Sequence, residues 1–295
     1  MFNNFSNYAG VAVLRFLALL PYQTLVSLGY GLGYLASHIP NDRNRVAQKN
    51  LELCFPELSA QEINQLRERH WRLLGRSIVE KSIIWLGSKK RLADMIEVQS
   101  EVDLADRKPR ILVNMHFIGI EGSIILSALA KDKGWPHTSG FFQRMKNPFF
   151  NRKIIEWRNR FGGNSIDRQG NSIALIREIC KGSFIIIAPD IDLGLKDSTF
   201  APFFNIQTNT ITAVSRLAKI TGAQVCMMIT TLKENEAGYI CSISKPLENF
   251  PTENPEEDTA RLNQIFEQEI RLRPAEYYWV HKRFKNRPLN EVSPY

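Results

Sequence analysis

A histidine and a glutamate stand five residues apart where a predicted strand gives way to a predicted helix. Residues 111–113 are apolar and β-branched enough for a buried strand, and the stretch from residue 122 onward has helical character. On one helix, His116 and Glu121 would point roughly 140° apart and could not meet. Across a tight strand-to-helix turn they could meet, in the crevice where α/β sheets bind ligands.

The chemistry that such a pair could perform is general-base catalysis. The dipole of the helix would hold Glu121 anionic, and its carboxylate could accept a hydrogen bond from one imidazole nitrogen of His116. The second nitrogen could then take a proton from a hydroxyl group. The same pattern also fits a histidine satisfied in a turn beside a glutamate at a helix start, and the spacing alone leaves both interpretations open.

Length and charge limit the classes of protein that fit. The 295 residues suffice for one large domain or two small ones, and the 44% hydrophobic content is ordinary for a globular protein. The formal net charge of +8 indicates an anionic partner, which could be nucleic acid, an anionic lipid surface, a phosphorylated substrate or an acidic protein. Four scattered cysteines without a CxxC pair favour free thiols in a reducing compartment.

Several kinds of site have no support in the sequence. His116, Asp190 and Asp192 could meet around a cation, but no HxxxH, HExxH or CxxC spacing occurs, so we expect no metal. The glycine-rich loops of nucleotide sites are missing, so we expect no bound nucleotide cofactor. The GxSxG elbow of serine hydrolases is missing too.

The N-terminal segment is apolar from residue 8 to residue 37 and is followed by a basic run. It exceeds the ~20 residues that cross a bilayer, although Arg15, Pro21 and several glycines interrupt it. We therefore predict that residues 1–40 form a helical membrane anchor that spans the bilayer or lies in its interface, with positive charge on the cytoplasmic side. The alternative is a pair of core helices.

Beyond the anchor, residues 43–97 have a helical pattern, with a capping signal at Ser59 and Glu62 and with His70 expected on a helix surface. Strands and helices then alternate, which predicts an α/β fold with a mixed, largely parallel central sheet flanked by helices. We assign residues 41–295 to one catalytic domain. The predicted strands are 111–115, 137–142, 184–189, 224–231 and 238–244. The predicted helices are 121–131, 148–161, 171–180, 209–221 and 258–271.

Two further groups of residues could bind a ligand. Asp190 and Asp192 follow an apolar strand, where they could position a cationic or hydroxyl-rich group or could simply form a turn. Arginines and lysines alternate with aromatic residues in three stretches. Such clusters suit a phosphate-bearing ligand at a membrane interface or nucleic acid, or they form a solvated face. Their candidate arginines are Arg144, Arg158, Arg160 and Arg283.

The spacing of His116 and Glu121 resembles the His-x4-(Asp/Glu) signature of glycerolipid-type acyltransferases. Other stretches resemble the branch of that superfamily that adds secondary acyl chains to lipid A. These are residues 50–58 (NLELCFPEL), Arg144 with Asn147 and Pro148, residues 200–204 (FAPFF) and residues 274–288 (PAEYYWVHKRFKNRP).

The resemblance implies a mechanism. A fatty acyl chain would move from an acyl carrier protein thioester to the 3-hydroxyl of a chain on a lipid A precursor, with no cofactor. His116 would deprotonate that hydroxyl, and Glu121 would orient His116. Arg158 or Arg160 would stabilise the oxyanion, with backbone amides near Gly119 as the alternative.

The remaining candidates, Arg144, Asp190, Asp192 and Arg283, would serve the oxyanion or the substrate phosphates. The partners implied are acyl carrier protein, the lipid A precursor and inner-membrane lipids, with no nucleic acid and with the catalytic domain on the cytoplasmic face of the inner membrane.

This chain departs from the family pattern in two places, which puts the acceptor pocket in doubt. Asn205 follows the Phe-Phe pair where a glycine is usual, and the strand-end motif is Asp190-Ile191-Asp192 instead of Asp-Gln. Two alternatives stay open. One is an acyl-CoA-dependent acyltransferase that acts on another glycolipid or on a phospholipid. The other is a non-catalytic membrane-associated protein that binds anionic ligands.

Overall fold

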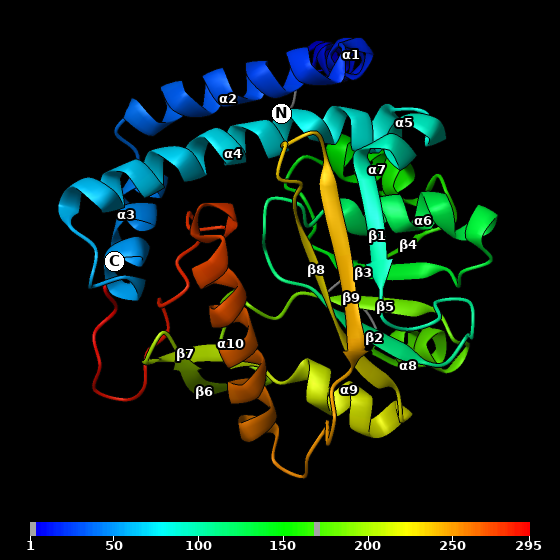
Figure 1. The fold of residues 1–295 in the computed structure, drawn as a ribbon, viewed down its shortest axis with the longest axis vertical. Helices are drawn as coiled ribbons and strands as arrows, with labels where there is room; N and C mark the ends of the chain where they lie inside the picture. The colour runs from blue at the N-terminus through cyan, green and yellow to red at the C-terminus, as the bar shows by residue number, and fades with distance from the viewer. Residues whose placement is uncertain (1–3, 168–171) are drawn as a thin grey trace.

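A seven-stranded sheet forms the centre of the molecule (Figure 1), in a computed structural model that describes residues 4–167 and 172–295. Its strand order is β1-β9-β8-β2-β5-β3-β4, and only β8 and β9 run antiparallel to each other. This confirms the predicted mixed, largely parallel sheet. The strands are β1 (Ile96–Ser100), β2 (Arg110–Val113), β3 (Thr138–Phe142), β4 (Asn164–Asp167), β5 (Phe184–Ile187), β8 (Gln224–Leu232) and β9 (Tyr239–Pro246).

Helices cover both faces of the sheet, because the central strands are apolar on both sides. Ile111 and Val113 of β2 face a core shared with α3, α8, α9 and α10, whereas Leu112 faces the opposite core under α4, α5 and α6. The helices are α1 (Asn4–Leu19), α2 (Tyr22–His38), α3 (Asp42–Cys54), α4 (Ala60–Leu86), α5 (Lys89–Met95), α6 (Gly122–Lys133), α7 (Pro148–Asn159), α8 (Ser172–Cys180), α9 (Ala213–Thr221) and α10 (Pro255–Leu272).

A separate hairpin of β6 (Ser198–Phe203) and β7 (Ile206–Ile211) packs against α10. The predicted helix 209–221 was wrong at its start, because residues up to 211 belong to β7. The hairpin turns through Phe204 and Asn205, which both have positive φ. Asparagine tolerates this left-handed conformation better than most residues, so the Asn205 that replaces the usual glycine still fits the turn.

The other predicted elements agree with the structure within a few residues, although residue 171 at the start of one predicted helix lies outside the described residues. The capping box of Ser59 and Glu62 at the start of α4 is confirmed. All four cysteines are free, as predicted, and three of them are buried. The expectation for His70 was wrong, because α4 is covered along this face and His70 is fully buried. Burial lowers the pKa of His70 to about 4.

The N-terminal segment forms two helices that break at Pro21, and α2 runs along α4 at the top of the molecule in Figure 1. The two backbones touch, since a Cβ on Gly75 would lie 2.3 Å from the carbonyl oxygen of Gly29. Within residues 4–167 and 172–295, no helix has the length and apolarity needed to cross a membrane. The spanning form of the predicted anchor is therefore wrong, and the proposed division at residue 40 stays a prediction.

A buried ion pair fastens α2 to the sheet. Arg76 and Glu80 of α4 are almost fully buried and lie 2.9 Å apart. Tyr22 and Tyr30 of α2 are within hydrogen-bond distance of Arg76, and Tyr239 of β9 donates to Glu80. A buried charge pair costs desolvation energy unless hydrogen bonds satisfy it, and here three phenol groups supply them. This network fixes α2 against α4 and β9.

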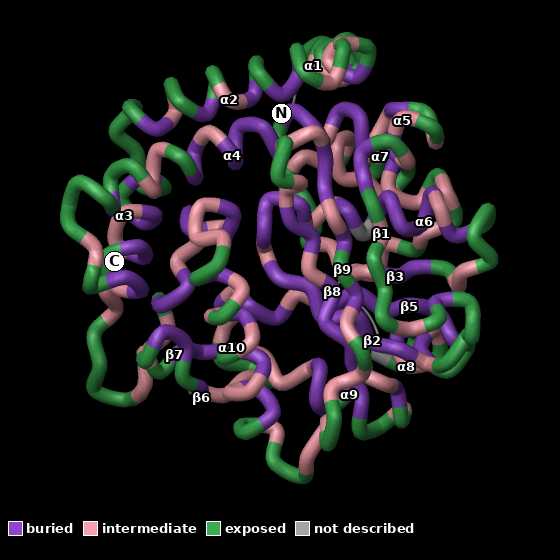
Figure 2. The backbone as a smooth tube through the Cα atoms, viewed as in Figure 1, coloured by how far each residue is buried: buried purple, intermediate pink, exposed green. Residues whose placement is uncertain are grey.

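The outward faces of α1 and α2 are apolar although they are exposed. In Figure 2 the outward turns of α2 are coloured as exposed. The side chains recur at helical spacing and form one stripe on each helix. The stripe of α1 is Phe5, Tyr8, Val13, Phe16 and Leu19, and that of α2 is Leu28, Leu32, Leu35 and the following Ile39.

Candidate active site

The site lies where β2 and β5 end. These strands are parallel neighbours with Val113 opposite Ile187, so the chain leaves both at the same edge of the sheet. His116 lies three residues beyond Val113, and Asp190 lies three residues beyond Ile187. The Nδ1 of His116 lies 2.7 Å from Oδ1 of Asp190, and the backbone N–H of His116 donates to Oδ2 at 2.8 Å. Equal offsets from paired strand ends thus bring the two together.

The electrostatics of this pair fix the tautomer of His116. Asp190 is fully buried, which by itself raises the pKa of its carboxyl. The charge of His116 and the two hydrogen bonds from it outweigh that effect and hold the pKa of Asp190 below its usual value. An anionic Asp190 accepts, so Nδ1 of His116 carries the proton and Nε2 keeps its lone pair. The side chain of His116 is 23% exposed and can meet a substrate.

Glu121 pairs with a different partner from the one predicted. It stands at the N-cap of α6 and is ion-paired with Arg158 near the end of α7. Burial raises the pKa of Glu121, but the charges of Arg158 and Lys81 bring it below the usual value. Among the hydrogen bonds of the described residues, none joins Glu121 to His116. The predicted contact is therefore corrected: Asp190, rather than Glu121, holds the imidazole, because Arg158 offers Glu121 a full opposite charge.

The other candidate arginines lie in different surroundings. Arg158 is partly buried, and its Nε has no partner among the described residues. Arg160 donates to the carbonyl of Ile84 and lies 4.0 Å from the ring centroid of Phe161. Arg144 is exposed and ion-paired with Asp167. Of the three, only Arg158 contacts the predicted catalytic residues.

Asp192 and Arg283 hold the loops around the site. Asp192 is buried and accepts hydrogen bonds from the backbone of Gly194 and from Asn209 and Asn286. Arg283 is 2% exposed and donates to the carbonyl of Asn209 and to a neighbouring hydroxyl. The predicted turn is confirmed for Asp192, whose side chain bonds the backbone two residues on, and binding of a ligand group by the two acids stays a prediction. Asp190 positions a histidine, whereas Asp192 organises a turn.

The C-terminal segment completes the site. The backbone N–H of Tyr278 donates to the carbonyl of His116 at 2.9 Å, and the hydroxyl of Tyr277 donates to the carbonyl of Asp190 at 3.0 Å. The ring of Tyr278 lies 6.3 Å from the imidazole of His116. The sequence pattern pointed to this segment but predicted no role for its tyrosines. Its density of aromatic residues was the available signal.

His281 is a second histidine that sequence analysis missed. Burial and the nearby charge of His116 lower the pKa of His281 to about 4, so it stays neutral. Its buried Nε2 has no hydrogen-bond partner in the part of the chain that the structure describes. Asn50 of α3 donates to the carbonyl of His281 and holds the backbone there. A second histidine, which stays neutral, therefore lies near the histidine that Asp190 holds.

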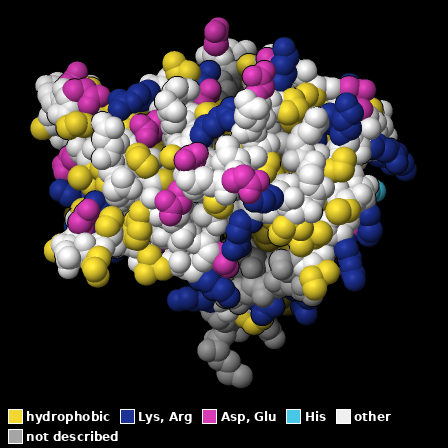
Figure 3. Space-filling model, turned by 90° about the horizontal axis from the view of Figure 1, so that it is seen from below, with side chains coloured by type: hydrophobic (Ala, Val, Ile, Leu, Met, Phe, Trp, Pro, Cys, Tyr) yellow, Lys and Arg dark blue, Asp and Glu magenta, His cyan; other side chains and the backbone are white. Residues whose placement is uncertain are grey.

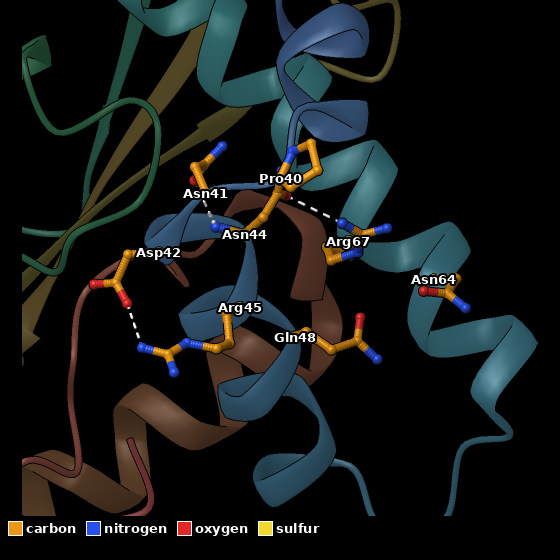
Figure 4. A pocket seen from close by; sticks show the side chains of 8 residues that line it. All are labelled: Pro40, Asn41, Asp42, Asn44, Arg45, Gln48, Asn64 and Arg67. Atoms are coloured by element: carbon orange, nitrogen blue, oxygen red, sulfur yellow. Dashed lines mark hydrogen bonds and ion pairs between the residues drawn. The ribbon is translucent and has the colours of Figure 1, made fainter.

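A cavity of about 660 Å³ lies at the turn from α2 to α3 (Figure 4). Asp42, at its rim, is 3.1 Å from Nζ of Lys282, which connects the cavity wall to the C-terminal segment. In its wall, Arg67 donates to Asn44, and every lining residue except Pro40 is of a polar type. The lining residues are Pro40, Asn41, Asp42, Asn44, Arg45, Gln48, Asn64 and Arg67.

The surplus positive charge is not gathered into one patch on the face drawn in Figure 3, where basic side chains lie among acidic and apolar ones. Several arginines and lysines of the chain are paired with acids at the surface, as Arg45 is with Asp42 and Lys89 is with Asp132. This mixed face differs from the continuous basic stripe typical of nucleic-acid-binding proteins.

Comparison with known proteins places the chain. The family model for bacterial lipid A biosynthesis acyltransferases matches residues 1–286. The chain is 32% identical to the lipid A biosynthesis palmitoleoyltransferase of Escherichia coli (strain K12), over 97% of this chain and 93% of that protein. It is 30% identical to the lauroyltransferase of the same organism, over 98% and 94%, and 23% identical to the myristoyltransferase, over 98% and 89%. The chain therefore belongs to the bacterial lipid A biosynthesis acyltransferase family.

Proposed function

We propose that this protein transfers a fatty acyl chain from an acyl carrier protein thioester to the 3-hydroxyl of a chain on a lipid A precursor. The observation that carries the proposal is the pairing of His116 with Asp190, which leaves Nε2 of His116 free to accept a proton. Nε2 would take the hydroxyl proton as the oxygen attacks the thioester carbonyl. The C–S bond would then break, and the leaving thiolate would recover that proton from His116.

Arg158 is our candidate for stabilising the tetrahedral oxyanion. Glu121 holds its guanidinium, and the free Nε–H of Arg158 can donate to an oxygen. A donor of this kind contributes roughly 10²–10³ in turnover. The backbone N–H of Gly119 is the alternative, because those of Ile118 and Ile120 already donate to the carbonyls of Glu276 and Phe117.

The acyl donor distinguishes this function from its nearest alternative, an acyl-CoA-dependent transferase. The net charge of +8 favours an acidic carrier protein and a phosphorylated acceptor. Rates measured with both donors at equal concentration separate the two functions. We expect the carrier-protein thioester to react at least 10-fold faster, because it adds a charged protein surface to the same thioester.

We further propose that the protein attaches to the cytoplasmic face of the inner membrane through the outward stripes of α1 and α2. Apolar side chains in such an arrangement favour a helix lying in the membrane interface. Replacing Phe16 and Leu19 by glutamate should release the protein from lipid vesicles of any headgroup charge, in a sedimentation assay. Vesicle binding equal to that of the wild type would refute the attachment.

The reaction itself is tested by mass spectrometry of the acceptor. Purified protein, carrier-protein thioester and lipid A precursor should yield a product heavier by one acyl group. His116→Ala should abolish this gain while the protein keeps its circular dichroism spectrum. A folded His116→Ala protein with full activity would overturn the proposal.

A further inference from the structure

A second cavity, of about 390 Å³, lies between α1 and α7. Its apolar wall is made by Tyr8, Val11 and Ala12 of α1 and by Phe149 of α7, and the rings of Tyr8 and Phe149 are 5.4 Å apart. Two helices that are far apart in the sequence therefore line one cavity, and two aromatic rings form part of its wall. Nothing in the acyl-transfer mechanism uses it.

The two helices are fastened together, so the cavity has a defined shape. The amide of Asn147, the N-cap of α7, donates to the side chain of the buried Asn7 at 2.8 Å. One turn further along α1, a Cβ on Gly10 would lie 2.9 Å from the ring of Phe150, so a larger residue there would push the helices apart. The other end of α1 is held by Arg91, which donates to the carbonyls of Ala18 and Leu20.

Two cations line the same cavity. Arg15 of α1 is exposed and has no ion pair or hydrogen bond with any residue in the described ranges. Lys153 of α7 pairs with Glu156 at 2.9 Å, one turn away on the exposed helix surface, which is a weak interaction that a better anion can replace. The first turn of α7 contains no acidic residue, so its helix dipole adds positive potential to that of the cations. The cavity thus combines an apolar wall with net positive charge.

The position of the cavity indicates what occupies it. Tyr8 belongs both to the cavity wall and to the outward stripe of α1, so the cavity opens at the level where the proposed membrane interface begins. At that level the anions are lipid phosphates, and each has acyl chains on its membrane side. An anionic headgroup would lie between Arg15 and Lys153, and its chains would follow the apolar stripe.

We propose that the cavity between α1 and α7 binds one anionic glycerophospholipid of the membrane. This inference rests on the proposed membrane attachment, and it adds a specific lipid site to it. Because α7 also carries Arg158, about five residues or ~8 Å along the helix from Lys153, a lipid in this cavity would hold the helix that contacts Glu121.

The test uses short-chain lipids that stay monomeric in water, so that general attraction to a charged surface does not contribute. Dihexanoyl phosphatidylglycerol, dihexanoyl phosphatidylcholine and inorganic phosphate are titrated separately into the full-length protein in a calorimeter. We expect one phosphatidylglycerol to bind per chain, with the zwitterionic lipid and free phosphate at least 10-fold weaker, because neither combines net charge with acyl chains.

Matched variants locate the binding. Arg15→Gln with Lys153→Gln should weaken phosphatidylglycerol binding roughly 30-fold, the loss that two cations at an anionic lipid give. The control, Lys131→Gln with Lys133→Gln, removes the same charge from exposed positions at the end of α6 and should change binding less than twofold. Circular dichroism melting establishes that both variants are folded.

Three results would overturn the inference: equal affinities of the two double variants, equal binding of the two lipids, or binding of inorganic phosphate as strong as that of phosphatidylglycerol. A rise in KM for the lipid A precursor in Arg15→Gln with Lys153→Gln, without a loss of phosphatidylglycerol binding, would assign the cavity to the acceptor instead. Failure of acyl transfer itself would leave the lipid titration unaffected, so the two proposals are tested separately.

Discussion

Two carboxylates near the site are both paired, Asp190 fully buried and Glu121 nearly so, yet they differ in what they can do. Asp190 holds the imidazole of His116, a group that a substrate can reach. Glu121 holds the guanidinium of Arg158, which stays charged throughout any reaction. The first pair can move a proton, whereas the second can only place a positive charge. The two residues of the His-x4-Glu spacing therefore do not pair with each other. Each pairs with a residue far away in the sequence, His116 with Asp190 and Glu121 with Arg158.

The largest effect should come from breaking the first pair. Asp190→Asn removes the anion that keeps the proton on Nδ1 of His116, and the asparagine amide can instead donate to that nitrogen. We expect kcat to fall roughly 10²–10⁴-fold, the usual contribution of general-base catalysis. Steady-state acyl-transfer rates with the purified variant measure this, and near-wild-type kcat in a folded Asp190→Asn protein would show that Asp190 is not needed to orient His116.

Breaking the pair of Arg158 and Glu121 should lower the free energy of unfolding as well as the rate of acyl transfer. Arg158→Met leaves the carboxylate of Glu121 buried without its counter-ion, which should lower the free energy of unfolding by about 3 kcal/mol. Adding Glu121→Gln removes the unpaired charge and should restore most of the loss. Urea unfolding of the single and double variants measures both effects. If the double variant is no more stable than the single one, burial of the charge is not the cause.

A third carboxyl, that of Glu276, extends this contrast, because it is buried and forms no ion pair with any residue that the structure describes. Burial raises the pKa of Glu276 to about 7, and its carboxyl accepts from the backbone of Leu232. The folded protein therefore binds a proton that the unfolded chain releases near pH 4.5, so stability is complete below that pH and falls as the pH rises through 7. Glu276→Gln should remove this fall and gain about 2 kcal/mol at pH 8. Urea unfolding at pH 5 and pH 8 tests it, and parallel pH profiles of variant and wild type would contradict it.

The smallest change in the free energy of unfolding should come from breaking an exposed ion pair. Arg144 is ion-paired with Asp167, and its side chain is 68% exposed. Solvent screens such a pair, so Arg144→Gln should change the free energy of unfolding by less than about 1 kcal/mol. A loss as large as that of Arg158→Met would show that burial does not explain the difference between the pairs.

Sequence patterns located His116 and Asp190 separately but could not join them. Each follows an apolar run that was predicted as a strand, and the α/β fold followed from the alternation of such runs. That β2 and β5 are neighbours is not visible in the sequence, because β3 and β4 intervene along the chain and lie on the far side of β5. Without this strand order, the nearest acid in sequence, Glu121, was the natural partner for His116.

The N-terminal helices show what hydropathy alone cannot predict. Hydropathy indicated a membrane segment, but it could not show that α2 touches α4 through Gly29 and Gly75. Small residues that loosen a membrane span are the same residues that let two helices approach. Which role applies depends on the partner helix, and the network around Arg76 that fixes α2 is formed by residues from three separate elements.

The most direct test of the account is the tautomer of His116, measured by ¹⁵N NMR on protein with labelled histidine. We predict that the neutral imidazole carries its proton on Nδ1 in the wild type and in Glu121→Gln, and loses this preference in Asp190→Asn. A preference that survives in Asp190→Asn and disappears in Glu121→Gln would contradict it.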